Sequence, residues 1–571
     1  MAENIAIGIQ SFDKLREGNY YYIDKTDFIK EWWESGDDVT LITRPRRFGK
    51  TLNMSMVEEF FSMDYAGRGE LFEGLSIWQD EKYRELQGTY PVISLSFARV
   101  KETDIASTKR RIIELLMAQF EKYAFLTDSD KLSLNEKEYM KKMAREMDAF
   151  DAGSCLHRLS EFLSRHYGKK VIILLDEYDT PMQEAYVNDF WDEMVAFIRS
   201  LFNATFKTNP YMGRAIMTGI TRVSKESVFS DLNNLKVVTT TSGEYATSFG
   251  FTEKEVFHAL DKCGLGEEKE EVKRWYDGFV FGEHKDIYNP WSILNFLDTG
   301  QYQTYWANTS SNGLVNKLIR EGDGEIKQSM EQLLKGEHLL RPIDEQIVYN
   351  QLDYNEDAIW SLLVAGGYLK ILDYEHLEKV ARGKRPNYEL ALTNGEVRYM
   401  FDEMVLGWFA PVKTPYNNFV KSMFANDLKA MNHYMKRVTL QTFSYFDTSK
   451  GPLGDEPERF YHGFVLGLLV DLSSEYIVTS NRESGFGRYD VMIEPRDKNK
   501  DAILLEFKIH DPDDEKDLKD TVASALAQIE KKQYETTLIA KGIPKERIHK
   551  YGFAFQGKNV LIGEASTTNI T

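Results

Sequence analysis

The stretch DVTLITRPRRFGKTLNMSM, residues 38–56, limits the possible folds of this 571-residue chain more than any other stretch. It joins a short apolar strand to a helical segment through a loop that ends in Gly49, Lys50 and Thr51. In a phosphate-binding loop, backbone N–H groups at the helix start surround the phosphates, the lysine reaches the terminal phosphates, and the hydroxyl joins a magnesium shell. Because Gly-Lys-Thr turns are also common on protein surfaces, the prediction of a nucleotide site needs support from other segments.

The start of the loop departs from the usual pattern. Arg44 stands where a glycine is expected, six residues before the lysine, and Arg46 and Arg47 follow it. The lost glycine constrains the loop, while the two arginines add positive charge beside the phosphate site. These features favour nucleotide binding over fast hydrolysis.

Two later strands end in polar residues that suit the same site. The run VIILLDEYD places Asp176 and Glu177 at the end of a buried strand, where one carboxylate can hold magnesium and its neighbour can orient a water molecule. The run AIMTGITR ends with Thr218 and, just beyond, Arg222. These two residues are either a sensor of the terminal phosphate or a capped strand end beside a surface arginine, and the sequence favours neither.

The apolar pattern predicts an α/β fold for the first part of the chain. The short β-branched runs VTLIT, PVISLSF, VIILL and AIMTGI are typical of buried parallel strands. Longer segments with helical periodicity lie between them, and strands that alternate with helices indicate an open parallel sheet flanked by helices. This is the architecture of a P-loop NTPase.

The rest of the chain divides at changes of pattern. From residue 251 it becomes mainly helical, starting at FTEKEVFHALDKCG, where Thr252 and Glu255 have capping-box spacing. The run TSKGPLGDEPE, rich in Gly, Pro and acid, marks a boundary near 450, and a smaller α/β unit follows. We therefore predict an ATPase-like domain (1–250), a helical lid or connector (251–450) and a C-terminal α/β domain (451–571).

Charge and cysteine content exclude some classes of protein. A net charge of −19 argues against coating nucleic acid through the overall field, although a local basic groove is compatible with it. Cys155 and Cys263 lie far apart, so neither a disulfide framework nor a zinc cluster is expected, and both should be buried thiols. The N-terminus has no leader-like pattern and no apolar run is long enough to span a bilayer, so we expect a cytoplasmic protein without a membrane partner.

A second candidate site lies in the segment GRYDVMIEPRDKNKDAILLEFKI. A hairpin there would bring Asp490 beside Glu506, so that two carboxylates share one divalent metal. Lys508 lies on the same strand face as Glu506 because side chains alternate with a period of two. Such a metal activates water and stabilises phosphate charge during phosphodiester cleavage, with the lysine alongside. The alternative is a solvated strand face, since E-x-K alone is very common.

The blocks IGIQSFDKLREGNYYYIDKT, TRPRRFGKTLNMSM, LLDEYDTP, TGITRVSKESVFSDLNNL and YNPWS, in this order, resemble the bacterial AAA-ATPase-like family whose members are often fused to a PD-(D/E)XK nuclease. The resemblance covers most of the chain and implies a P-loop ATPase fold that binds ATP. The arginine-rich loop is usual in that family. Asp24, Lys25 and Thr26, in the first block, either contact the nucleotide or, as we prefer for Asp24, cap a helix.

The C-terminal order of helix, Asp strand, E-x-K strand and helix resembles the PD-(D/E)XK core, a restriction-endonuclease-like fold. The resemblance implies that Asp490 and Glu506 are metal ligands and that Lys508 is the catalytic lysine. It also implies a helical acid, Glu458, and an auxiliary amide, Gln528. Glu458 is otherwise an acid that favours a helix N-terminus. His462, one turn later, either approaches the site or is a core histidine.

Together these features predict an ATP-binding, Mg²⁺-dependent nuclease that ATP regulates. The predicted partner is nucleic acid, with DNA favoured over RNA. Defence against foreign DNA would be a natural setting. The alternative is a nucleotide-dependent switch or assembly protein whose nuclease-like domain binds nucleic acid without cutting it. Translocation along DNA is disfavoured because no helicase-type motif is present. The sequence is compatible with a homo-oligomer.

Overall fold

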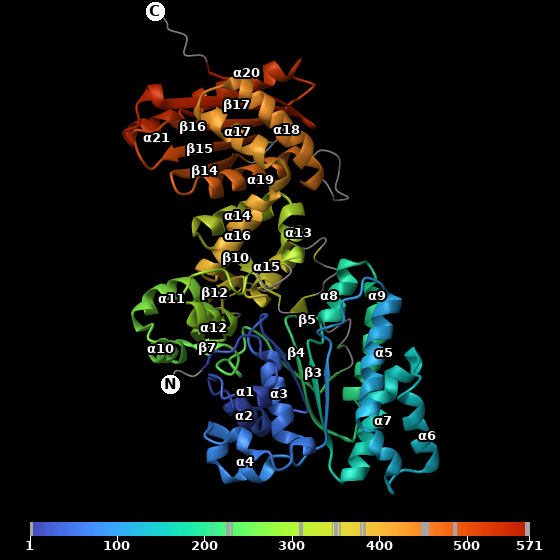
Figure 1. Cartoon of the computed structure of the whole chain (residues 1–571). Coiled ribbons are helices and arrows are strands. Elements are labelled where there is room, and N and C mark those ends of the chain that lie inside the picture. The colour runs from blue at the N-terminus through green and yellow to red at the C-terminus, as the bar shows by residue number, and fades with distance from the viewer. Residues whose placement is uncertain are drawn as a thin grey trace, which may run out of the picture. The chain divides into compact units, whose positions relative to one another are not determined.

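The computed structural model describes residues 4–207, 209–223, 229, 232–307, 312–344, 346–347, 352, 356–376, 378, 380, 384–446, 456–483 and 488–565 (Figure 1). Its contacts divide the chain into two compact units. The first contains Met1–Ser311 and Leu340–Val397, and the second contains Asn312–Leu339 and Arg398–Thr571. The helical region expected at 251–450 is therefore shared between the two units. In the described part of the chain, no helix combines the length and the apolar character needed to cross a bilayer.

A parallel sheet of five strands forms the centre of the first unit, in the order β2-β3-β4-β1-β6. Its strands are β1 (Val39–Thr43), β2 (Val92–Ser96), β3 (Val171–Asp176), β4 (Met212–Gly219) and β6 (Leu235–Val238). The first four are the four predicted strands. Every residue of β1 and β3 is buried, as expected of a sheet that helices cover on both faces.

Helices flank this sheet on both sides (Figure 1). They are α1 (Phe12–Glu17), α2 (Asp27–Ser35), α3 (Lys50–Phe61), α4 (Glu81–Leu86), α5 (Ile105–Lys122), α6 (Leu134–Met143), α7 (Ala149–Tyr167), α8 (Thr180–Val187) and α9 (Trp191–Phe202). Cys155 is buried in α7, whereas Cys263 is only partly buried, so the expectation of a buried thiol is wrong for Cys263.

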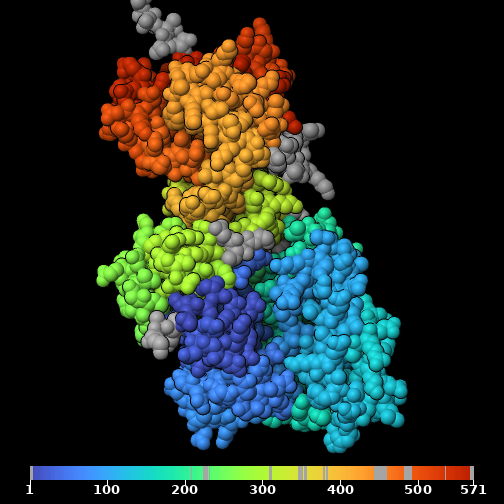
Figure 2. Space-filling view, in the orientation of Figure 1, coloured from blue at the N-terminus to red at the C-terminus, as the bar shows by residue number. Residues whose placement is uncertain are grey.

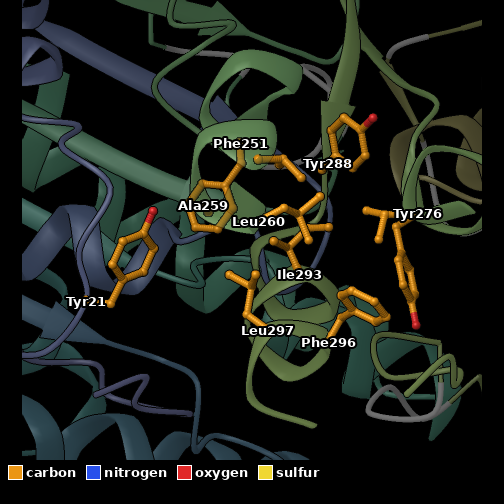
Figure 3. Close-up of a cluster of buried hydrophobic side chains, with 11 residues drawn as sticks. Tyr21, Phe251, Ala259, Leu260, Tyr276, Tyr288, Ile293, Phe296 and Leu297 are labelled. Carbon is orange, nitrogen blue, oxygen red and sulfur yellow. The ribbon is translucent and has the colours of Figure 1, made fainter. Parts of the chain in front are cut away.

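A smaller helical group completes the first unit, with its own core. It contains α10 (Glu253–Lys262), α11 (Lys269–Tyr276) and α12 (Pro290–Thr299), beside a three-stranded sheet of β7 (Phe251–Thr252), β9 (His284–Tyr288) and β8 (Phe279–Phe281). The predicted capping box at Thr252 and Glu255 is present, and Pro290 is the first residue of α12, where its fixed φ suits a helix. Tyr21, from the segment before α2, joins the core of this group (Figure 3). In the space-filling view the dark blue N-terminal residues accordingly border the green residues of this group (Figure 2).

Short strands interrupt the region expected to be mainly helical. The remaining elements of the first unit are β5 (Arg222–Val223), β11 (Gln346–Ile347), α15 (Glu356–Ala365), β12 (Leu369–Tyr374) and β13 (Asn387–Leu392). β12 and β13 pair in antiparallel fashion beside β10 (Leu339–Pro342). The run WSLLVAGGYLKIL is thus half helix and half strand. Its Gly367 adopts a left-handed φ of 82°, which ends the helix and starts the strand.

The second unit has a five-stranded mixed sheet in the order β14-β15-β16-β17-β18. Its strands are β14 (Tyr476–Glu483), β15 (Arg488–Pro495), β16 (Ala502–Ile509), β17 (Ile548–Gln556) and β18 (Asn559–Glu564). Its helices are α13 (Gly313–Glu321), α14 (Gly324–Lys335), α17 (Lys413–Phe424), α18 (Leu428–Phe446), α19 (Glu456–Asp471), α20 (Leu518–Lys532) and α21 (Tyr534–Ala540), with most of α16 (Gly395–Trp408). Only β16 and β17 pair in parallel, and α20 and α21 lie in the connection between them.

The two faces of β16 are covered by different helices. Phe507 stacks on Tyr461 of α19, with ring centroids 5.7 Å apart. Lys508, the next residue, donates a hydrogen bond to Ser524 of α20, at 2.7 Å. Because successive side chains of a strand alternate between faces, Glu506 lies on the α20 side with Lys508. The expected charged face of this strand is therefore covered by a helix.

Candidate functional site

The loop between β1 and α3 has the backbone form of an anion-binding site. Gly49, which precedes α3, has a φ of 77°, and Arg47 has a φ of 66°. A left-handed conformation is uncommon for a residue with a side chain and marks a locally constrained backbone. Phe48 anchors the loop between them, because its ring packs on Phe279 and Phe281 of β8, with centroids 4.7 and 5.4 Å away.

Arg44 points away from the loop and braces its base. Its guanidinium is fully buried and donates hydrogen bonds to the carbonyls of Thr43 and Thr239, at 3.0 and 2.5 Å, and of Glu244, at 3.0 Å. It also lies over the Phe281 ring, 4.5 Å from its centroid. Burial lowers the pKa of this guanidinium, and the negative charge of Glu244 opposes that shift. The residue that breaks the glycine pattern is thus a structural support.

Lys50 is the first residue of α3, and its ammonium contacts the loop that precedes the helix. Its Nζ donates to the carbonyl oxygens of Arg44 and Pro45, at 2.9 and 2.8 Å. Burial lowers the pKa of this ammonium, and the carboxylates of Glu177 and Asp176 oppose that shift. A phosphate would replace these neutral acceptors with a charged one, which makes a stronger hydrogen bond.

Thr51 and Asp176, predicted to share a magnesium ion, are in direct contact. The Thr51 hydroxyl donates to Asp176 Oδ2 at 2.7 Å, and the Thr218 hydroxyl donates to Asp176 Oδ1. Burial raises the pKa of Asp176, and the two hydroxyl donors oppose the shift. A hydroxyl and a carboxylate are the hard oxygen donors that Mg²⁺ prefers, so these residues fit the ion.

The other predicted members of this site lie around Asp176. Glu177 has a left-handed φ of 51° and faces the cavity described below, and its N–H donates to Thr218 Oγ1 at 3.4 Å. Thr218 is fully buried, so it acts on Asp176 and on the backbone of Glu177. Arg222 lies on β5, where it pairs with Gln346 of β11. Neither Thr218 nor Arg222 is among the described residues that line the cavity.

The DEYD and TGIT runs are locked together by Asp179. Its buried carboxylate accepts hydrogen bonds from the N–H groups of Ile220 and Thr221, both at 2.9 Å. The Tyr178 hydroxyl donates to the carbonyl of Thr221 at 2.7 Å. A Cβ at Gly219 would lie 2.7 Å from the Tyr178 ring and 2.8 Å from Asp179 Oδ1, which explains the glycine. These contacts hold the ends of β3 and β4 in a fixed relation.

A cavity of about 400 Å³ opens above the loop. Arg46 reaches across it to Gln183 of α8, with Nη2 3.1 Å from Oε1. The sequence arguments missed other residues of its lining, among them Lys101, Gln183 of α8 and Trp291 of α12. Lysine and glutamine carry no motif signal alone, whereas YNPWS was visible but was used only as one block of the family resemblance.

The DKT segment has mainly a structural role. Asp24 accepts hydrogen bonds from the N–H of Thr26, the residue before α2, and from the N–H of Ser76, at 2.9 and 2.7 Å. It therefore stabilises the entry to the helix, although Thr26 occupies the N-cap position itself. Lys25 lines the cavity, but its Nζ is paired with Glu255 at 2.7 Å. Burial lowers the pKa of Lys25, and Glu255 opposes that shift.

In the second unit, β15 and β16 form the hairpin that the sequence predicts. Their antiparallel register sets Asp490 directly opposite Glu506. The side chain of Asp490 lies outside the described residues, as does that of Glu458 on α19. Glu506 is fully buried, and Lys508 is 7% exposed. Oxygen donors from opposed positions of two strands fit a divalent cation of the magnesium type.

α20 runs along the strand face that carries Glu506 and Lys508. His510 Nδ1 lies 3.1 Å from Thr521 Oγ1, and Lys508 Nζ lies 2.7 Å from Ser524 Oγ. Each step of two residues on the strand thus matches about one turn of the helix, and one further step along both elements leads to Glu506 on the strand and to Gln528 on the helix. Gln528 is 8% exposed, and its Nε2 has no hydrogen-bond partner among the described residues. Its amide is therefore a buried donor on the helix that covers the Glu506 face of β16.

His462, which the sequence leaves as either a site or a core residue, is buried on α19. α19 packs against the strand face opposite to α20, where Tyr461 contacts Phe507 and Phe555. This is the aromatic core of the second unit.

Comparison with known proteins identifies both regions. Residues 6–229 match the family model described as Predicted AAA-ATPase, and residues 456–565 match that of the PD-(D/E)XK nuclease superfamily. An uncharacterized protein in the vnfD 5' region of Azotobacter chroococcum mcd 1 is similar over nearly the whole length, with 26% identity over 562 residues, or 97% of this chain and 96% of that protein. The similarity runs through both matched regions.

Proposed function

We propose that this chain, which joins a predicted AAA-ATPase domain to a domain of the PD-(D/E)XK nuclease superfamily, is a nuclease that ATP controls. ATP binding or turnover in the first unit regulates Mg²⁺-dependent cleavage of nucleic-acid phosphodiester bonds in the second. The observation that carries this proposal is the register of β15 and β16, which opposes Asp490 and Glu506 two residues from Lys508. Defence against foreign DNA is the setting that we propose from the architecture alone.

The residues of the second unit have distinct roles in this proposal. Asp490 and Glu506 would hold the cation, which supplies an activated water and neutralises phosphate charge. Lys508, which Ser524 holds, would stabilise with its ammonium the charge that develops on the scissile phosphate. Gln528 offers a buried N–H₂ group that can donate to the substrate or to the attacking water.

The residues of the first unit support the nucleotide part of the proposal. The N–H groups at the start of α3 and the Lys50 ammonium would bind the phosphates. Thr51 and Asp176 would hold a magnesium ion, which would neutralise charge on the phosphates. Glu177 lines the same cavity and would orient a water molecule.

The test uses the full-length chain with supercoiled DNA, linear DNA and RNA, in Mg²⁺ or EDTA and with or without ATP. We expect Mg²⁺-dependent cleavage that Glu506→Gln and Lys508→Ala abolish. Glu530→Gln, which removes one charge from an exposed position of α20, should cut at the wild-type rate. Lys50→Ala should retain the cutting residues and lose the effect of ATP on the rate.

The rival function, a switch whose second unit binds nucleic acid without cutting it, gives a different result in the same assay. It requires nucleic-acid binding by the wild type with no cleavage under any nucleotide condition. Glu506→Gln would then leave every readout unchanged. Cleavage that survives Glu506→Gln would instead indicate a contaminating nuclease and remove the proposed site.

A further inference from the structure

The YNPWS segment, residues 288–292, forms one wall of the cavity. The phosphate-binding motif assigns no role to this wall. Asn289 caps α12, because its Oδ1 accepts hydrogen bonds from the N–H groups of Trp291 and Ser292, at 2.9 and 3.3 Å. Its Nδ2 donates to the carbonyl of Arg46 in the loop, at 3.3 Å. The Oδ1 and Nδ2 of the fully buried Asn289 side chain thus together hold the start of α12 against the phosphate-binding loop.

Trp291 extends this contact with an aromatic surface. The Arg47 guanidinium lies 4.3 Å from the centroid of its indole ring, the distance of a cation–π stack. Gly8 approaches the ring from the N-terminal segment, since a Cβ there would lie 4.0 Å from Cζ3. The indole is therefore bordered by the loop and by residues 6–10, and it also faces the cavity.

The lining of the cavity changes in character away from the loop. Arg46, Lys50 and Thr51 give one part of the wall polar and cationic groups. Ile9 of the N-terminal segment, with Trp291 and Leu294 of α12, gives another part apolar groups. The core that Tyr21 forms with α10 and α12 (Figure 3) holds these two segments together, because Ile5 of the N-terminal segment and Leu294 of α12 both pack against it. A triphosphate alone makes no use of an apolar wall, whereas a planar base does.

We infer that this apolar wall is the nucleoside subsite of the cavity, and that Trp291 and Leu294 bind the base and ribose of a nucleoside triphosphate. The inference rests on the proposed nucleotide binding and adds the part of the ligand that the motif does not specify. The volume of about 400 Å³ suits a drug-sized ligand that is mostly enclosed. The subsite takes a planar, stacking group, and Asn289 is a positioning residue that holds it beside the phosphates.

The experiment compares two probes that share the phosphates and differ in the nucleoside. Calorimetric titration of the full chain with the β,γ-imido analogue of ATP and with inorganic tripolyphosphate, each with Mg²⁺, separates the two parts of the ligand. Lys50→Ala should weaken both probes. Trp291→Ala should weaken the ATP analogue by about tenfold or more, the usual effect of losing one aromatic stacking partner, and leave tripolyphosphate within about twofold of the wild type.

Further variants separate the contact from a loss of folding. Trp291→Phe should restore most of the affinity, because it keeps an aromatic face, and Leu294→Ala should act in the same direction as Trp291→Ala. Trp275→Ala is the matched control, because Trp275 packs on Tyr302 in the same helical group and is not among the described residues that line the cavity. Equal loss of both probes in the Trp291 and Leu294 variants, or no loss, overturns the nucleoside subsite. Failure of the wild type to bind either probe overturns the proposed function itself.

Discussion

At the scale of single residues, Arg44 stands where a phosphate-binding loop usually has glycine, so the motif suggests that glycine would be tolerated there. We predict the opposite. Arg44→Gly restores the usual glycine of a phosphate-binding loop, yet we expect it to destabilise the first unit. The carbonyls of Thr43, Thr239 and Glu244 would lose their buried donor, at a cost of about 3 kcal/mol or more. Thermal unfolding measures the loss. Arg44→Lys should recover part of it, and an unfolding temperature equal to that of the wild type would contradict the bracing role.

Ser524 gives a second prediction at this scale. Its hydroxyl accepts a hydrogen bond from the Lys508 ammonium, and such supporting contacts to a site residue affect rates by about 10- to 100-fold. Ser524→Ala should therefore slow Mg²⁺-dependent cleavage by at least about tenfold with little change in KM, and Ser524→Thr should recover it. Single-turnover cleavage rates test this. An unchanged rate in Ser524→Ala would show that Lys508 is held by other groups.

Glu396, at the start of α16, makes the stability of the first unit depend on pH. Its buried carboxyl accepts hydrogen bonds from Ser292 Oγ and from the N–H of Trp306, at 2.8 and 2.6 Å, and burial raises its pKa to about 7. The folded state therefore keeps a proton that the unfolded chain releases above its ordinary pKa. The contribution of this group to stability is full below about pH 4.5 and falls by an amount on the order of 3 kcal/mol as the pH rises to about 7.

Glu396→Gln tests this dependence, because the amide keeps the shape without the titration. The variant should match the wild type in stability near pH 5 and exceed it near pH 8. Unfolding midpoints across that range give the comparison. Parallel curves for the two proteins would mean that Glu396 stays ionised in the folded state.

At the scale of elements, Asn432 of α18 closes an open edge of the second sheet. Its Nδ2 donates to the carbonyl of Ile562 at 2.9 Å, and its Oδ1 accepts from the N–H of Ile562 at 2.8 Å. The side-chain amide thus pairs with β18 as a neighbouring strand would. Asn432→Ala should destabilise the second unit by about 1–3 kcal/mol and promote association through the exposed edge.

Chemical unfolding and light scattering measure these two effects of Asn432→Ala. Asn417→Ala is the matched control, because it removes the same amide from an exposed position of α17 in the same unit. The control should unfold at the wild-type denaturant concentration and scatter no more light than the wild type. Equal behaviour of the two variants would mean that the amide of Asn432 does not protect the β18 edge.

The elements that the sequence predicts well are those with local signals. The alternation of β-branched runs with helical periodicity predicts the central sheet, and Thr252 with Glu255 predicts the start of α10. The GG pair in WSLLVAGGYLKIL was a visible signal that the prediction did not use, since Gly367 ends a helix there. The bracing by Arg44 and the Trp291 wall depend on contacts between distant segments, so spacing and periodicity contain no signal for them.

The candidate nuclease site also has one part that local sequence signals predict and another that they do not. The hairpin from Asp490 to Glu506 follows from a polar turn between two strands, so the sequence predicts the opposed positions. The match of α20 to β16, with Ser524 against Lys508, depends on the register of a helix on a strand. No local pattern specifies that register, and Ser524 was not among the predicted residues.

At the scale of the whole molecule, the second unit begins well before the nuclease-like segment of the sequence. The composition change near 450 predicted a domain of residues 451–571, whereas α17 and α18 belong to the same compact unit. Phe419 of α17 packs on Phe464 and Phe553, with ring centroids 5.5 and 6.2 Å away. A composition change marks where the chain is polar, and it carries no information about which helices cover a sheet.

Because the second unit includes α17 and α18, fragments with and without these helices should differ in stability. A fragment of residues 451–571 would expose the aromatic face that Phe419 covers and the β18 edge that Asn432 pairs with. A fragment of residues 398–571 keeps both, and although it lacks α13 and α14, it should show cooperative unfolding and resist limited proteolysis. The shorter fragment should be digested quickly and should bind a dye that reports exposed apolar surface. Because burial of large aromatic groups supplies much of the stability of a small domain, equal protease resistance of the two fragments would mean that α17 and α18 are not part of the folding unit.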